Sequence, residues 1–198
     1  MINVIGVNSC TQSPFSCLIE NSKKILFDTG ADSKILLYNM KLLDINPKTI
    51  DIVVLSHNHW DHTGGLKGFL KANENKAKIY HPTDFSKPTK ITDDVYSTGY
   101  LQSSFLGIKE QALFFKTEKG LTVIVGCSHP GVDKIVDVAK EYGKVYAVIG
   151  GFHGFNKFDY LKGIDIIGAC HCTQYIQEIK ERYPKNYKEI KAGQVIEV

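Results

Sequence analysis

The sequence predicts a mixed α/β fold, and three observations predict it. Short apolar runs typical of buried strands recur along the chain, helical apolar spacing appears between several of them, and histidines gather where strands end. The 198 residues are 43% hydrophobic and 23% charged, as in ordinary globular domains, and a chain of this length buries roughly 70% of its unfolded surface. No linker, repeat or low-complexity tract divides the sequence. We therefore expect one domain over residues 1–198.

The predicted strands are apolar runs bounded by turn residues. They cover residues 2–7, 16–20, 24–28, 50–55, 78–81, 111–116, 121–125, 145–149, 164–167 and 194–198. The segment 83–92 has no periodicity, so we expect it to form a loop.

Helices are predicted between these strands. The clearest covers residues 132–142, where apolar side chains recur on one face and Gly143 ends the pattern. Weaker patterns predict helices over 32–43 and 66–71. A further helix is expected over 173–182, with Thr173 as its N-cap.

Six of the seven histidines lie in four short clusters, each directly after a predicted strand. The clusters are HNHWDH at 57–62, GCSH at 126–129, GGFH at 150–153 and ACHC at 169–172. Neutral imidazole is the commonest protein ligand for borderline transition metals, and a neighbouring carboxylate suits a divalent ion. The four ligands of the first cluster do not fit comfortably around one tetrahedral ion. We therefore expect two ions a few ångström apart; the alternative is a surface turn with hydrogen-bonded histidines.

The charge and cysteine patterns exclude several classes of protein. Arg182 is the only arginine, which argues against sequence-specific nucleic-acid binding and leaves a small molecule as the expected partner. Five irregularly spaced cysteines do not form a secreted disulfide framework. No apolar stretch approaches the roughly 20 residues that cross a membrane, and the N-terminus does not look like a signal peptide. We expect a cytoplasmic protein that is not bound to a membrane.

The first cluster carries a resemblance to a known family. Residues 57–65, HNHWDHTGG, resemble the His-x-His-x-Asp-His signature of the metallo-β-lactamase superfamily, and LFDTG at 26–30 resembles its upstream Asp-Thr-Gly element. The later clusters are most similar to the branch named for dihydropterin-ribofuranosylaminobenzene-phosphate synthase. The resemblance implies an αββα sandwich, in which two mixed sheets are flanked by helices.

The resemblance also implies a set of metal ligands. The first ion would be held by His57, His59 and His129. The second would be held by Asp61, His62 and His171.

His153 is a further candidate ligand. It stands at a strand end where many members of the superfamily have a bridging Asp or Cys. A hydrogen bond to a ligand and a contact with substrate are the alternatives for this residue.

Three residues near the clusters have other expected roles. Asp28 is expected to hydrogen-bond a metal-bound imidazole, with a helix N-cap as the alternative. Cys127 and Cys172 flank ligands and are expected to be small packing residues, although either could reach a metal.

The expected cofactors are two divalent ions, zinc first, with manganese or iron as alternatives. Zinc lowers the pKa of its bound water from about 16 to about 7, and Asp61 would be the catalytic residue that orients this nucleophile or takes its proton. The sequence thus predicts a dinuclear hydrolase of a small ester, phosphoester or lactone, including phosphorylated pterin precursors. The segment 82–91 is short for the named branch, which weakens the pterin expectation.

Two other functions remain open. One is a non-catalytic metal-binding module. The other is a di-iron redox protein, although His59 stands where such proteins usually have Glu and no flavin domain is present.

Overall fold

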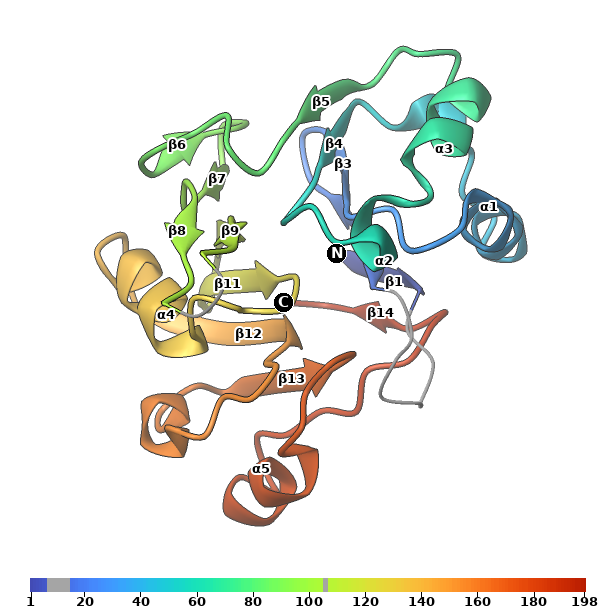
Figure 1. The fold of residues 1–198 in the computed structure, drawn as a ribbon. Coiled ribbons are helices and arrows are strands. Elements are labelled where there is room, and N and C mark those ends of the chain that lie inside the picture. The colour runs from blue at the N-terminus through green and yellow to red at the C-terminus, as the bar shows by residue number, and fades with distance from the viewer. Residues whose placement is uncertain (7–14, 105–106) are drawn as a thin grey trace.

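Two six-stranded sheets pack face to face between two layers of helices (Figure 1). The computed structural model describes residues 1–6, 15–104 and 107–198. The strand orders are β14-β1-β2-β3-β4-β5 in the first sheet and β13-β12-β11-β10-β7-β6 in the second, with β8 and β9 paired separately. The αββα sandwich expected from the sequence is confirmed.

The first sheet is built mainly from the N-terminal part of the chain. Its strands are β1 (Ile2–Gly6), β2 (Ser16–Glu20), β3 (Lys24–Phe27), β4 (Ile52–Val54), β5 (Lys78–Tyr80) and β14 (Val195–Ile196). Strands β3, β4 and β5 are parallel, and the remaining pairs are antiparallel.

The second sheet follows the same design. Its strands are β6 (Thr89–Lys90), β7 (Val95–Ser97), β10 (Leu113–Thr117), β11 (Gly120–Val125), β12 (Val145–Gly151) and β13 (Ile166–Cys170). Strands β11, β12 and β13 are parallel. The separate pair is β8 (Leu101–Gln102) and β9 (Lys109–Glu110).

Helices α1 (Ser33–Leu42), α3 (Leu66–Ala72), α4 (Val132–Lys140) and α5 (Ile176–Arg182) cover the outer faces of the two sheets. The one-turn helix α2 (Trp60–Thr63) carries Asp61 and His62, and two 3-10 turns, η1 (Pro47–Thr49) and η2 (Phe158–Leu161), complete the structure. Figure 1 shows α1 and α3 on one outer side and α4 and α5 on the other. None of the helices among the described residues is both long and apolar enough to span a lipid bilayer.

Three apolar cores hold these layers together. The central core lies between the sheets and includes Phe27 of the first sheet and Ile124 of the second, both fully buried. A second core joins the second sheet to α4 and α5, and a third joins the first sheet to α1 and α3. Burying apolar surface on both faces of each sheet explains why the strands before the histidine clusters are continuous apolar runs.

Two expectations about local structure were wrong. Helix α5 begins at Ile176, and Thr173 does not cap it: its hydroxyl donates to the Cys170 carbonyl (2.6 Å) and accepts from the Phe152 N–H (2.9 Å). The segment 83–92, expected to be a loop, contains the two-residue strand β6. The end of the expected strand over 2–7 lies outside the described residues.

Candidate metal centre

The candidate ligands lie where parallel strands of the two sheets end. The first cluster follows β4 and the GCSH cluster follows β11, whereas the GGFH and ACHC clusters begin in the last two residues of β12 and β13. The turns that follow β11, β12 and β13 each contain a residue with a positive φ: Ser128 (60°), His153 (44°) and His171 (51°). Residues other than glycine rarely adopt this conformation, which costs of order 1–3 kcal/mol and occurs preferentially at functional sites. Here it turns the chain sharply at the ends of the strands.

The structure brings together the three residues expected at the first ion. The Nε2 atom of His57 lies 3.0 Å from Nδ1 of His59. The ring centroid of His129 lies 4.7 Å from that of His57 and 4.9 Å from that of His59. Residues about 70 positions apart in the sequence therefore lie close enough together to bind one common ion.

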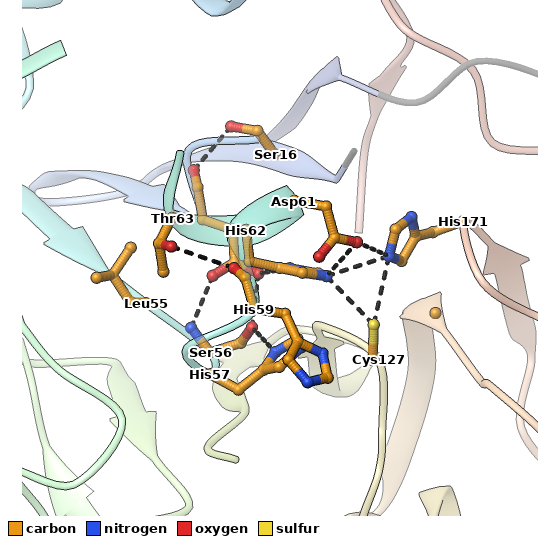
Figure 2. Close-up of polar contacts among 12 residues, drawn as sticks. Ser16, Leu55, Ser56, His57, His59, Asp61, His62, Thr63, Cys127 and His171 are labelled. Carbon is orange, nitrogen blue, oxygen red and sulfur yellow. Dashed lines mark hydrogen bonds and ion pairs between the residues drawn. The ribbon is translucent and has the colours of Figure 1, made fainter. Parts of the chain in front are cut away.

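The three residues expected at the second ion also converge (Figure 2). The Nε2 atoms of His62 and His171 lie 3.1 Å apart. An oxygen of Asp61 lies 3.6 Å from the first of these atoms and 3.5 Å from the second. Both histidines are buried, whereas the Asp61 side chain is 25% exposed.

Hydrogen bonds at Nδ1 leave the Nε2 atoms of two histidines directed at the centre. His62 Nδ1 lies 2.6 Å from the Asp28 carboxylate. The Ser56 hydroxyl donates to Asp28 (2.7 Å), so it accepts the Nδ1–H of His57 (2.9 Å). These tautomers, assigned from the hydrogen-bond network, match the arrangement in which a metal-bound imidazole donates its other N–H to an anion or hydroxyl. The donor set therefore fits divalent metal ions.

Asp28 connects the two halves of the first cluster. Its carboxylate accepts the Ser56 N–H (2.7 Å) as well as the two side chains just described. It does not cap a helix, because α1 is capped by Asp32. Burial raises the pKa of Asp28. Burial alone would lower the pKa of His62, but the charge of Asp28 outweighs this effect, so the pKa of His62 is raised. The pair therefore holds one proton tightly, on the side of His62 away from the centre.

Glu110 has the corresponding role for the second sheet, and the sequence analysis did not find it. This buried carboxylate accepts the backbone N–H groups of Cys127, Ser128 and His129, each at 2.8 Å, and lies 2.8 Å from His129 Nδ1. Burial opposes its ionisation, but the hydrogen bond with His129 and nearby histidine charges lower its pKa to about 2. The only signal in the sequence is one acidic residue directly before the predicted strand over 111–116.

Burial also controls the protonation of the first ligand group. It lowers the pKa of His57 to about 2 and lowers the pKa of His59 below its ordinary value. Both imidazoles are therefore neutral at physiological pH, and only the neutral ring can donate a lone pair to a metal.

Cys127 lies inside the centre, although the sequence analysis assigned it to packing. Among the described residues, two sets of His and Cys donors have all their ligand atoms within 4.8 Å of one another. They are His57, Cys127 and His129, and His62, Cys127 and His171. The contact with Cys172, together with burial, raises the pKa of the Cys127 thiol, so it is protonated when no cation is bound.

His153 lies beside the centre and belongs to neither of these donor sets. Its ring centroid is 5.0 Å from that of His129. Both residues line a cavity of about 280 Å³, whose wall also includes Phe152, Lys134 and Lys157. Burial lowers the pKa of His153, so its ring faces this cavity in the neutral form.

Comparison with known proteins places the chain in a family. The sequence pattern of the metallo-beta-lactamase superfamily matches residues 13–152. A 7,8-dihydropterin-6-methyl-4-(beta-D-ribofuranosyl)-aminobenzene-5'-phosphate synthase from Methanocaldococcus jannaschii is 30% identical over 247 aligned positions, covering 88% of this chain and 84% of the relative. A ribonuclease Z from Pediococcus pentosaceus is 26% identical over 163 positions, covering 70% of this chain and 52% of that protein.

Solved structures show the same fold. A metal-dependent hydrolase of the beta-lactamase superfamily matches with a TM-score of 0.76 at 24% identity, covering 100% of this chain and 98% of its own. A metallo-beta-lactamase fold protein from Bacillus subtilis matches with a TM-score of 0.72 at 13% identity, covering 98% and 97%. Since the superfamily pattern spans most of the chain and the synthase is similar over most of its length, this protein belongs to the metallo-β-lactamase superfamily, whose members bind metal ions.

Proposed function

We propose that the protein is a hydrolase that uses two divalent metal ions, zinc first, on a small ester, phosphoester or lactone. The observation that carries the proposal is the convergence of Asp61, His62 and His171 beside the His57–His59 pair. A bound divalent ion supplies Lewis acidity and a water acidic enough to lose its proton near neutral pH.

The side chains of the protein divide the remaining work. Asp28 and Glu110 hold His62 and His129 by their Nδ1 atoms, so the ligand geometry is set before substrate arrives. Asp61 is the carboxylate of the centre with solvent access, and it can orient the attacking water and accept its proton.

The cavity beside the centre supports an anionic substrate. Lys134 and Lys157 lie on its wall, with Lys157 also paired to Asp133 (2.6 Å). The synthase relative is named for a product that carries a 5'-phosphate, which makes phosphoesters, including phosphorylated pterin precursors, the first substrates to test. The described cysteines are free thiols, which supports a reducing compartment such as the cytoplasm.

The test is hydrolysis by the metal-loaded protein of a panel of generic carboxylic esters, lactones, phosphomonoesters and phosphodiesters. We expect Asp61→Asn to lower kcat by about 100-fold or more, the typical contribution of a general base. Asp93→Asn, a change at an exposed carboxylate that forms an ion pair with Lys90, is the matched control and should retain full activity. A fully metal-loaded protein that hydrolyses nothing in the panel would contradict the proposal and favour a non-catalytic metal-binding module.

A further inference from the structure

Cys127 is the one residue that belongs to both donor sets among the described parts of the chain. Its Sγ atom lies 3.2 Å from Nε2 of His62 and 3.3 Å from Nε2 of His171 (Figure 2). It also lies within 4.8 Å of the ligand atoms of His57 and His129. The thiol therefore stands between the two positions at which the histidines converge.

The distances match those around a single metal ion. With zinc–nitrogen bonds of about 2.0 Å and a zinc–sulfur bond of about 2.3 Å, tetrahedral ligands place two nitrogens ~3.3 Å apart and a nitrogen and a sulfur ~3.5 Å apart. The His62–His171 separation of 3.1 Å and the two sulfur–nitrogen separations fall slightly below these values. Only a small expansion is needed for an ion to enter.

The environment of Cys127 differs from that of a packing cysteine. Cys17 and Cys170 lie in the apolar core between the sheets, as small hydrophobic residues do. Cys127 is only 4% exposed, yet its sulfur contacts ring nitrogens. Burial among lone pairs gives a thiol little apolar contact and suits a metal ligand.

The local backbone presents Cys127 to the centre together with His129. Glu110 fixes the N–H groups of both residues. The preceding residue, Gly126, lies so close to Ser56 that an added Cβ would be 2.2 Å from the Ser56 hydroxyl oxygen. Glu110 on one side and Ser56 on the other thus hold the turn in place, and the Cys127 sulfur points to where the ligands meet.

No other described residue takes the place of a shared ligand. His153, at the strand end where a bridging residue was expected, joins neither donor set and lines the cavity instead. Asp61 contacts the second pair of histidines but also belongs to neither set.

We propose that Cys127 binds as a thiolate shared by the two metal ions. The thiol proton passes to solvent as the first ion binds, and no oxidant or reductant takes part. The inference rests on the metal centre of the proposed function, but not on the reaction. A thiolate among imidazoles favours zinc or cobalt over magnesium or manganese, which prefer oxygen ligands.

The experiment is a titration of the metal-free protein with Co²⁺, followed by optical spectroscopy. We expect a near-ultraviolet thiolate-to-cobalt charge-transfer band that grows through both equivalents of metal. Cys127→Ser should lose this band and keep the visible d–d bands of bound cobalt. Cys172→Ser is the matched control, since this neighbouring thiol approaches Cys127 but lies outside both donor sets, and it should keep the band.

Several results would overturn the inference: no band in the wild-type protein, a band that remains in Cys127→Ser, or a band lost in Cys172→Ser but not in Cys127→Ser. If Cys127→Ser does not fold, X-ray absorption of the zinc-loaded wild-type protein decides. One sulfur per zinc at about 2.3 Å supports a shared thiolate, and half a sulfur or none contradicts it. Charge transfer without any hydrolysis would refute the proposed function alone, and hydrolysis without sulfur ligation would refute this inference alone.

Discussion

At the scale of single residues, the centre is organised by two buried carboxylates, one from each half of the chain. Asp28 holds His57 through Ser56 and holds His62 directly, and Glu110 holds His129. Buried carboxylates lose hydration that only partners of opposite charge or hydrogen-bond donors replace. Divalent cations a few ångström away would stabilise both anions, so the same groups that orient the imidazoles also make the centre attractive to metal.

One consequence is that the metal-free protein should lose stability in acid through His57. The unfolded chain binds a proton there below pH 6.5, whereas burial keeps the folded pKa at about 2, so protons favour the unfolded state between these values. His57 should therefore lower the free energy of unfolding by about 1.4 kcal/mol for each unit of falling pH in that window.

The measurement is urea denaturation in the presence of a chelator at pH 6.5, 5.5 and 4.5, comparing the wild-type protein with His57→Gln. Glu110 acts with the same sign only below its ordinary value of 4.5, because its folded pKa is about 2, so this range separates the two groups. The variant should show the shallower pH dependence, and equal slopes would contradict the assigned burial of a neutral His57.

A second prediction concerns His153, which lies beside the ligands but outside both donor sets. Asparagine tolerates its positive φ of 44°, so His153→Asn should fold. We expect an unchanged metal content. The KM should rise about tenfold, because the variant loses one hydrogen bond to the substrate in the cavity. Elemental analysis showing that the variant has lost one metal ion per chain would instead make His153 a ligand.

The sequence indicated much of this chemistry, but not all of it. Clustering of histidines after apolar runs predicted a metal centre, and the resemblance to the metallo-β-lactamase superfamily predicted which imidazoles meet. Glu110 could not be found in this way, since its partners are backbone N–H groups of a turn 17 to 19 residues further on. Cys127 was assigned to packing because no spacing in the sequence distinguishes a packing cysteine beside a histidine from a cysteine that binds metal.

At the scale of elements, the turn after β11 depends on a strand outside the two main sheets. Glu110 ends β9, which pairs with β8 in a separate two-stranded sheet, and yet it fixes the whole segment 127–129. Strands β6, β7, β8 and β9 are two or three residues long and lie outside any longer apolar run, which explains why they were not predicted. The longer apolar runs, such as β11 and β12, were predicted to within a few residues because both of their faces are buried.

Removing the charge of Glu110 should weaken metal binding without removing any ligand. Glu110→Gln keeps the size of the side chain, but its amide group cannot accept all four N–H bonds, so His129 loses its fixed orientation. Metal affinity should fall by about 10- to 100-fold, as for other residues that orient a ligand. Competition with a chromophoric chelator measures the metal affinity, and Glu118→Gln, on an exposed turn, is the control. Unchanged affinity in Glu110→Gln would show that the segment 127–129 keeps its shape without Glu110.

At the scale of the whole molecule, the centre joins the two halves of the sandwich. The first cluster follows β4 of the first sheet, and His129 and His171 follow β11 and β13 of the second. Elsewhere the halves meet mainly through the apolar core between the sheets. Metal ions held by ligands from both sheets would therefore act as a cross-link that exists only in the folded chain.

Removing metal should consequently destabilise the entire fold and not only the site. A ligand that binds only the folded state stabilises it by about 4 kcal/mol when its free concentration is a thousand times its Kd. We expect the midpoint of urea unfolding to rise on adding zinc to the chelated protein. His171→Ala should lose part of that gain, because it removes one of the side chains from the second sheet that meet His62 while Cys127 remains, whereas His81→Ala, outside all clusters, should keep the whole gain. Equal midpoints with zinc and with chelator would mean that the ions do not connect the sheets, and a full gain in His171→Ala would mean that His171 is not a ligand.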